Sequence, residues 1–340
     1  MRVLNIHGIN DVRLDPTERP RLGDNDVILK IKACGICGTD LMFIRRGGLP
    51  QPGGRPMPLG HEAAGQVVAV GPAVEGVRVG QRMVLNPMRT AGLVGSGGSE
   101  GAFTEELLVR GARLHDSLLP MPDDLPYDVA ALTEPLAVAL HGVNRSEAKR
   151  DDKVVVFGCG PIGLAAVLWL ADRGVQDVVA VDISGERLQR ALALGAHAAV
   201  DPVKEDLRTR LTELHGRARV LSRDAVGTTA FIDAAGAPNI VPDVVSMAGY
   251  HARLVVVAAY RDPVSLHLGT MLTTEMTITT AMGYPTEMLE VLAALPRLRT
   301  QVASMISHRY AFDDVLQALG VAGTGASAKV LIDFEVGGHA

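Results

Sequence analysis

Cysteine is scarce in this chain, and its scarcity excludes several classes of protein. The 340 residues include only Cys34, Cys37 and Cys159, which are too few for the disulfide framework of a secreted domain and fit a reducing compartment. Long apolar runs are also missing, because polar residues interrupt the N-terminal stretch MRVLNIHGINDVRLDP and no other window could span a bilayer. Without a signal peptide or a membrane span, we expect a cytoplasmic protein.

Runs of like charge are absent as well. Acidic and basic residues are interleaved and give a net charge of −5, so neither a nucleic-acid groove nor a membrane-binding arm is expected. Apolar residues are plentiful, at 47% of 340 residues. A chain of this length and composition can fold into two domains that each bury a core.

The order of patterns along the chain indicates two kinds of domain. Up to about Pro126, short alternating runs such as DVILKIKA and AAGQVVAVG are broken by Pro/Gly clusters, which is typical of a β-rich module. Beyond it, helix-length stretches such as PIGLAAVLWLADRG alternate with the buried-strand runs KVVVFG, DVVAVDI, AFIDAAG and ARLVVVAAY. This alternation predicts an α/β domain with a doubly wound parallel sheet. The tail ends in the strand-like AKVLIDF.

A glycine motif in the second domain predicts a dinucleotide. Gly158, Gly160 and Gly163 follow a buried strand and open a helix, where glycine allows a tight turn and close approach to a pyrophosphate. Asp182 ends the next strand, nineteen residues after Gly163, where a carboxylate binds ribose hydroxyls and repels a 2′-phosphate. We therefore expect NAD rather than NADP. The residues expected at this cofactor are Gly158, Gly160, Pro161, Ile162, Gly163, Asp182, Arg187 and Val257.

Two of the assignments around this motif have plain alternatives. Arg187 either lies along the adenine or only solvates a helix face, and Cys159 is interpreted as an inert small residue. The motif as a whole could also be a glycine turn of an unrelated α/β protein, but strand, helix and acid in register argue against that.

Candidate metal ligands are concentrated in the first domain. KACGICGTDLMF contains Cys34 and Cys37, and PLGHEAAG contains His61 and Glu62. LTEPLAVALHGV has Glu134 in its third position. Thiolate, imidazole and carboxylate are ligands with which zinc can keep one position open for a substrate. A redox pair or half of a zinc ribbon is the alternative for C-x-x-C, but the thioredoxin context and a second C-x-x-C are both missing. We interpret Cys34 as a buried residue at a strand end.

At these motifs the chain resembles the zinc-dependent medium-chain alcohol dehydrogenases, and among them the polyol (sorbitol dehydrogenase-like) branch. The segments that carry the resemblance are CGICGTD, GHEAAGQVVAVG, EPLAVALH, FGCGPIGL with VAVDIS, and the late ISHRYAFDDV and AKVLI. The resemblance implies a GroES-like catalytic domain over residues 1–126, a Rossmann NAD-binding domain over 127–284, and a segment 285–340 that completes the catalytic domain. It also implies a homodimer or homotetramer.

The resemblance further implies roles for individual residues. Cys37 and His61 would bind zinc directly, while Glu62 and Glu134 would complete the ligand set directly or through water. Asp40 would orient the histidine, and Thr39 would contact the substrate oxygen. His61 and Glu62 are adjacent, so both reach one metal only if the backbone turns there. We therefore keep Glu62 and Glu134 as alternatives that exchange.

The chain departs from the family pattern at two places. Many relatives hold a second, structural zinc with four closely spaced cysteines, but the corresponding segment NPMRTAGLVGSGGSEGAF has none, so one zinc is expected. Met42 stands where most relatives have a histidine that passes the substrate proton to solvent, and a thioether cannot hold a proton. His141 lies on an apolar helix and is interpreted as a packed residue.

The sequence thus predicts an enzyme: a zinc- and NAD-dependent dehydrogenase that interconverts a secondary alcohol, such as a polyol or sugar derivative, and its ketone. A zinc-dependent reductase and a cyclitol- or lactone-forming dehydrogenase with the same residues are the alternatives. A non-enzymatic nucleotide-binding protein on the same fold is disfavoured by the ligand set. We also place Arg45 and Arg46 in a loop, as surface arginines or a contact for an acidic substrate.

Overall fold

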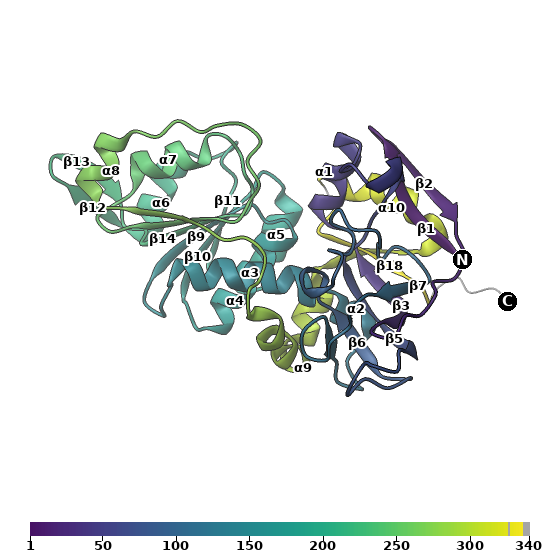
Figure 1. The fold of residues 1–340 in the computed structure, drawn as a ribbon. Helices are drawn as coiled ribbons and strands as arrows, with labels where there is room; N and C mark the ends of the chain where they lie inside the picture. Colours follow the sequence, from purple (N-terminus) through teal and green to yellow (C-terminus); the bar gives the residue numbers. More distant parts are fainter. Residues whose placement is uncertain (326, 336–340) are drawn as a thin grey trace. The chain divides into compact units, whose positions relative to one another are not determined.

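The computed structural model describes residues 1–325 and 327–335, which form two compact units. Met1–Glu134 and the C-terminal segment from Met288 make the first unit, and Pro135–Glu287 make the second. The chain therefore leaves the first unit and returns to it, so that its purple N-terminal and yellow C-terminal parts lie together in one fold (Figure 1).

A seven-stranded sheet forms the framework of the first unit. Its order is β17-β18-β3-β5-β6-β8, with β7 paired to β3. Strand β3 is central, because β5 pairs along one edge while β7 and β18 share the other. A three-stranded sheet, β2-β1-β4, stands beside it. The strands are β1 Arg2–Gly8, β2 Asp11–Pro16, β3 Val27–Gly35, β4 Met57–Pro58, β5 Glu62–Val70, β6 Arg82–Leu85, β7 Glu106–Val109, β8 Leu118–Pro120, β17 Ile306–Ala311 and β18 Lys329–Asp333.

The core of this unit follows the alternating runs of the sequence. Val27, Leu29 and Ile31 of β3 are buried, as the pattern DVILKIKA predicts, and they pack with residues such as Phe103 and Phe312 in one apolar cluster. The helices are α1 Gly38–Arg46, α2 Tyr127–Ala131, α9 Glu287–Met305 and α10 Val315–Ala322, with short 3-10 turns at Pro52–Gly54, Pro87–Arg89 and Phe312–Asp314. Arg45 and Arg46 form the exposed last turn of α1, so the prediction of a loop there is wrong.

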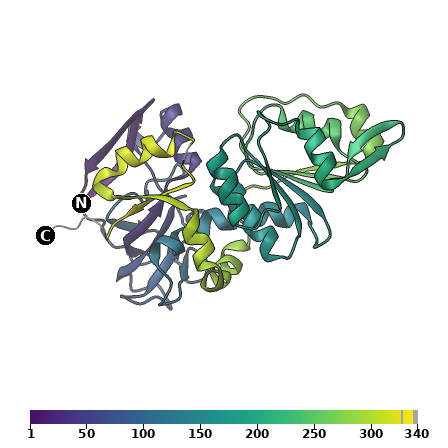
Figure 2. The same ribbon diagram turned by 180° about the vertical axis from the view of Figure 1, so that it is seen from behind.

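The second unit is a doubly wound parallel sheet with helices on both faces (Figures 1 and 2). Its strand order is β11-β10-β9-β14-β15-β16, and all neighbouring strands run parallel. The strands are β9 Lys153–Phe157, β10 Asp177–Val181, β11 Ala198–Val200, β14 Ala230–Asp233, β15 Arg253–Val256 and β16 Thr277–Thr280. The helices are α3 Thr133–Ser146, α4 Pro161–Asp172, α5 Gly185–Ala193, α6 Leu207–His215, α7 Ile240–Met247 and α8 Leu268–Thr274. This architecture confirms the predicted fold class.

The four buried-strand runs of the sequence all become neighbouring strands of this sheet, although β15 ends at Val256, earlier than its run suggests. A hairpin of β12 Arg217–Val220 and β13 Arg223–Val226 lies outside the sheet and was not expected. Helix α4 is almost wholly apolar because it is buried on nearly every side, and it begins with Pro161, which suits a first helical position. No helix within residues 1–325 and 327–335 has the length and hydropathy to cross a membrane.

Candidate metal centre and cofactor site

Cys37 lies where the central strand of the first unit gives way to a helix. Strand β3 ends at Gly35, and Cys37 is the cap residue before α1. The backbone N–H of Cys37 donates to Asp40 Oδ2 at 2.9 Å, which fixes this turn. Cys34, three residues earlier, is fully buried in the apolar cluster, and burial raises the pKa of its thiol well above the usual value. Its predicted burial is confirmed.

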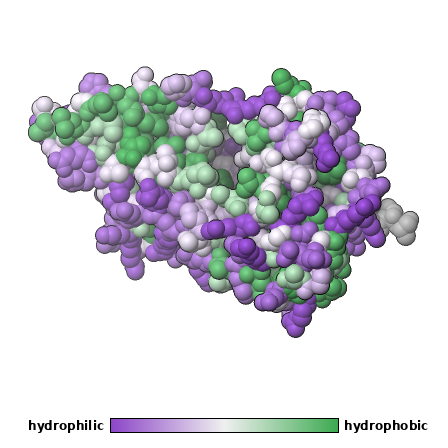
Figure 3. Space-filling view, viewed as in Figure 1, coloured by the Kyte–Doolittle hydropathy of each residue, from purple (hydrophilic) through white to green (hydrophobic). Residues whose placement is uncertain are grey.

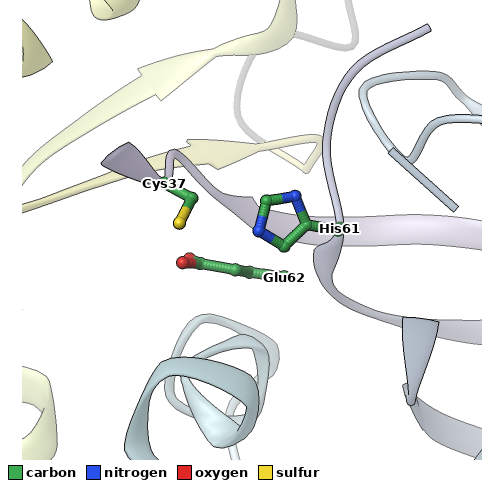
Figure 4. Close-up of side chains that lie close together, drawn as sticks. All are labelled: Cys37, His61 and Glu62. Atoms are coloured by element: carbon green, nitrogen blue, oxygen red, sulfur yellow. The ribbon is translucent and has the colours of Figure 1, made fainter. Parts of the chain in front are cut away.

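His61 and Glu62 both face Cys37, although they are adjacent in sequence (Figure 4). Strand β5 begins only at Glu62, and the preceding Gly60 has a φ of 92°, so the backbone turns before the strand. One donor atom from each of Cys37, His61 and Glu62 lies within 4.8 Å of the others. Among the residues that the structure describes, this is the one such group of three or more.

The turn that carries His61 is held by close backbone packing. Gly60 accepts a hydrogen bond from Ala102 N at 2.8 Å, and a Cβ at Gly60 would lie 2.6 Å from Phe103 N. A Cβ at Gly95, within the glycine-rich segment, would overlap the Gly60 carbonyl. Glycine is therefore required on both sides of this contact, and the glycine-rich segment supports the histidine turn directly.

Asp40 is fully buried beside the histidine. Its Oδ1 lies 3.5 Å from His61 Nδ1 and 3.4 Å from the Gly60 N–H that donates to it. Since Nδ1 faces Asp40, Nε2 is the ring nitrogen left for a metal. Burial disfavours the charged form of His61, but the negative charges of Asp40 and Cys37 outweigh this effect and raise its pKa well above the usual value. Such a negative environment, with sulfur, nitrogen and oxygen donors converging, fits a zinc ion.

Lys329 is a neighbour of this group that the sequence interpretation missed. It opens β18, is 1% exposed, and forms an ion pair with Glu62 Oε2. Its Nζ also donates to the Ile36 carbonyl at 3.0 Å. Desolvation lowers the pKa of Lys329, but the negative charges of Glu62, Cys37 and Glu134 together more than compensate, so the pKa is raised above its usual value. A lysine inside the strand-like run AKVLIDF was the available signal, because buried lysines are rare unless paired.

The other residues that the sequence singled out around the metal centre are not part of the three-donor group. Glu134 is buried in the first turn of α3 and is outside the compact three-donor group, although its charge acts on Lys329. Thr39 is half-buried in the first turn of α1. Met42 follows one turn later and packs against the apolar cluster. His141 binds Glu287 at 2.8 Å, as expected for a packed histidine.

The predicted cofactor residues gather at the carboxyl ends of parallel strands in the second unit. Gly158 follows β9 with a φ of 85°, and a Cβ at Gly163 would overlap the Gly158 carbonyl, so both glycines serve close packing. Gly160 precedes α4, and a Cβ there would meet nothing within 4 Å. The start of α4, with Pro161 and Ile162, is therefore accessible to a phosphate.

Asp182 follows β10 and is fixed by two backbone amides. Its Oδ2 accepts from Cys159 N at 2.6 Å, and its Oδ1 accepts from Ser184 N at 2.8 Å. Arg187 lies in the first turn of α5, where its N–H bonds to Ser184 Oγ. Burial, followed by the charge of Asp182, raises the pKa of the Cys159 thiol to about 12, which makes it a poor nucleophile.

Val257 follows β15, and its N–H donates to the Asp233 carbonyl at 2.9 Å. The neighbouring Asp233, which the sequence interpretation did not single out, is fully buried at the end of β14. Its carboxylate accepts from Ala235 N, Gly236 N and Tyr260 Oη, so it orders the loops that follow β14 and β15. Desolvation and this hydrogen bond raise the pKa of Tyr260 above its usual value.

Two family models match the chain. The model described as "Alcohol dehydrogenase GroES-like domain" matches residues 23–123, and the one described as "Zinc-binding dehydrogenase" matches residues 161–297. Among curated relatives, (R,R)-butanediol dehydrogenase of Bacillus subtilis (strain 168) is 31% identical, with 93% of this chain and 94% of the relative covered.

Sorbitol dehydrogenase of Bombyx mori is 29% identical, with 97% of each chain covered. The crystal structure of 2R,3R-butanediol dehydrogenase from Bacillus subtilis matches with a TM-score of 0.86 and 29% identity, covering 98% of this chain and 99% of that one. With the donor group and the dinucleotide turn described above, these matches have one explanation: the chain belongs to the zinc-dependent medium-chain alcohol dehydrogenase family, whose members are oxidoreductases acting on CH–OH groups.

Proposed function

We propose that this protein is an NAD-dependent dehydrogenase with one zinc per chain that interconverts a secondary alcohol and its ketone. The observation that carries this proposal is the convergence of Cys37, His61 and Glu62 in a buried, negatively charged site. The glycine turn and Asp182 of the second unit support the choice of cofactor.

In this proposal, different residues of the first unit would bind the zinc, orient its ligands and transfer the substrate proton. Cys37 and His61 would hold the zinc, with Glu62 or Glu134 as the carboxylate ligand, and Asp40 would keep His61 in the tautomer that leaves Nε2 free. When bound there, zinc would supply Lewis acidity toward the substrate oxygen, and a nicotinamide cofactor would accept the hydride. We infer that the Thr39 hydroxyl, two residues after Cys37 at the start of α1, would relay the substrate proton by accepting it and passing its own proton on.

The substrate class follows from what the relatives share. Butanediol and sorbitol dehydrogenases act, by name, on secondary alcohols with a hydroxyl on the next carbon, and L-threonine 3-dehydrogenase on one with a neighbouring amino group. We infer a small secondary alcohol with an adjacent hydroxyl or amino group.

A screen of such compounds tests the proposed function. Purified enzyme is incubated with NAD⁺ and, in parallel, with 2,3-butanediol stereoisomers, polyols, aldonates and β-hydroxy amino acids, and NADH is followed by absorbance. We expect oxidation of at least one vicinal compound, about one zinc per chain by metal analysis, and loss of activity after removal of zinc with a chelator. Zinc-free protein that oxidises these alcohols at full rate would refute the proposal.

The proposed single zinc is supported by residues 92–101, where a glycine-rich segment without cysteine stands. Gly95 of this segment packs directly on the Gly60 carbonyl. Close backbone packing would thus support the histidine turn here without a second metal.

The preference for NAD gives a prediction at Asp182. Replacing Asp182 with serine is expected to lower kcat/KM for NAD⁺ and to raise that for NADP⁺, because a carboxylate that repels the 2′-phosphate is removed. The ratio of kcat/KM for the two cofactors measures the effect, with Asp177→Ser, on the first residue of β10, as the control. An unmodified enzyme that prefers NADP⁺ would contradict the assignment.

We also propose a homo-oligomer joined through the second unit. Strand β16 is at the edge of its sheet, and Leu268 and Leu272 of the adjacent α8 are 70% and 79% exposed. The green area at the left of Figure 3 lies over this region. A sheet edge that no other strand of the described residues pairs with, beside exposed leucines, favours association. Light scattering is expected to give a multiple of the 35.9 kDa chain mass, and Leu272→Asp is expected to lower it; a monomeric parent would contradict this proposal.

A further inference from the structure

We propose that Lys329 is a positioning residue of the metal centre: its ammonium holds one oxygen of Glu62 and thereby limits how strongly this carboxylate binds the zinc. This inference rests on the proposed function, since it concerns the same metal. It assigns a role to a residue from the far end of the chain, 267 positions after Glu62 in sequence.

The ion pair between Lys329 and Glu62 is isolated from solvent. Lys329 and Glu62 are each 1% exposed, and their side chains form an ion pair inside the first unit. The ammonium also donates a hydrogen bond to the Ile36 carbonyl at 3.0 Å. Lys329 thus contacts both Glu62 and the segment that carries Cys37. Burying an ammonium group costs free energy unless the group is paired. Here its partner is the Glu62 carboxylate, which belongs to the three-donor group.

The register of the sheet brings Lys329 and Glu62 to the same face. Gly35 on β3 is directly opposite Glu62 on β5 and directly opposite Leu331 on β18. Lys329 is two residues before Leu331, so it shares that face of the sheet with Gly35 and Glu62. Strand β3 lies between the two charged residues, and they meet only because Gly35 has no side chain.

The geometry at Gly35 supports this directly. A Cβ built there would overlap Glu62 Oε2 and would lie 2.8 Å from Lys329 Cε. Gly35 has no positive φ, so the need for glycine comes from the space that the ion pair occupies and not from the backbone conformation. The missing side chain at Gly35 therefore lets the Lys329 ammonium cross the central strand β3 and reach Glu62.

The charges around the three donors support the same role for Lys329. Cys37, Glu62 and Glu134 all act electrostatically on Lys329, so its ammonium is a fixed positive charge among the anionic ligand candidates. A thiolate and one carboxylate already neutralise Zn²⁺, and a second full carboxylate ligand would weaken its Lewis acidity. By competing for Glu62, Lys329 would keep the exchange between Glu62 and Glu134 open and preserve a position for the substrate.

The test separates metal binding from turnover. Lys329→Met removes the charge at similar side-chain volume. If Lys329 restrains Glu62, the variant is expected to bind zinc as tightly as the parent or more tightly, measured by competition with a chromophoric chelator. Its kcat is expected to fall about tenfold to 100-fold, the range for residues that orient metal ligands.

Cobalt substitution gives a readout that does not depend on activity. With Co²⁺ in place of Zn²⁺, the visible absorption reports the number of ligands and the thiolate band reports Cys37. We expect weaker visible bands in Lys329→Met, as for a higher coordination number, with an unchanged thiolate band. Lys329→Arg, which keeps the charge, should restore the parent spectrum, and adding Glu62→Gln to Lys329→Met should remove the extra ligand.

Lys32→Met is the matched control. Lys32 also lies in the first unit and pairs with a glutamate, Glu335, at 2.7 Å, but this pair is at the surface and neither residue belongs to the three-donor group. It is expected to leave zinc affinity, spectrum and kcat unchanged.

The outcomes distinguish this inference from the function on which it rests. A Lys329→Met enzyme with the parent's cobalt spectrum and kcat overturns the role of Lys329 alone. Weaker zinc binding with an unchanged cobalt spectrum also overturns it, because it would show that Lys329 only stabilises the fold. A parent protein that takes up neither zinc nor cobalt overturns the proposed function and this inference together.

Discussion

Replacing Cys37 with alanine is expected to remove most of the bound zinc and nearly all activity. Four-ligand zinc sites bind with roughly 10–16 kcal/mol, so one ligand contributes about 3 kcal/mol, which corresponds to a loss of more than about 100-fold in affinity. The thiolate would also supply negative charge that helps to neutralise the cation in this largely buried site. Metal analysis after dialysis and kcat with the best alcohol of the screen measure both effects.

Cys34→Ala is the matched control for this experiment. Cys34 is the other cysteine of the C-x-x-C motif, but it is fully buried in the apolar cluster and is not among the three converging donors. Its replacement should keep zinc and turnover and lower stability only by about 1 kcal/mol, typical of a small core truncation. A Cys37→Ala protein with full zinc and full turnover would disprove the ligand assignment.

Thr39→Val is expected to lower kcat for alcohol oxidation by about 10²-fold, within the range for loss of an acid–base contact. Valine keeps the volume and the branching of threonine, so the first turn of α1 should persist while the hydroxyl is lost. The pH profile of kcat is the informative measurement, since a proton acceptor has been removed. A variant as fast as the parent at every pH would show that another group takes the proton.

If Thr39 relays the substrate proton, Met42 offers no group to receive it, and the proton would have to leave through the cofactor ribose and water. The two residues are three positions apart in α1 and therefore lie on neighbouring turns of one face. Met42 packs against the apolar cluster and has no group that can hold a proton. Met42→His introduces a group that titrates near neutral pH, so the oxidation rate should rise on the acid side of the profile if proton release limits it.

The result of Met42→His depends on where the new imidazole lies, so a structure of the variant with NAD⁺ belongs to the experiment. An unchanged pH profile, with the imidazole within hydrogen-bond reach of the cofactor ribose, would show that proton release does not limit the reaction. Met42→Leu is the control, because it keeps the apolar packing and adds no titratable group.

Much of the fold follows from local patterns in the sequence. The runs KVVVFG and DVVAVDI become β9 and β10 because continuous apolar residues suit strands buried on both faces. The spacing of Gly158 and Gly163 encodes a turn that permits only glycine, since a Cβ at Gly163 would overlap the Gly158 carbonyl. Asp182 could be located by counting from that turn, because a strand, a turn and a helix have nearly fixed lengths.

The metal centre could be predicted only in part. The residue types alone indicated the thiol, imidazole and carboxylate donors. Because His61 and Glu62 are adjacent in the sequence, it was open whether both side chains could face one point. The tertiary structure decides that they do, because Gly60 turns the backbone before β5 begins. It also gathers Glu62 and not Glu134 into the compact donor group.

The sequence by itself determined the class of the fold, the dinucleotide turn and the types of metal donor, since each depends on residues within one short segment. Only the tertiary structure revealed Lys329 beside Glu62, because that contact joins β18 to β5 across the glycine of β3. Local patterns carry no information on strand order or register, and a pair that forms across a third strand depends on both.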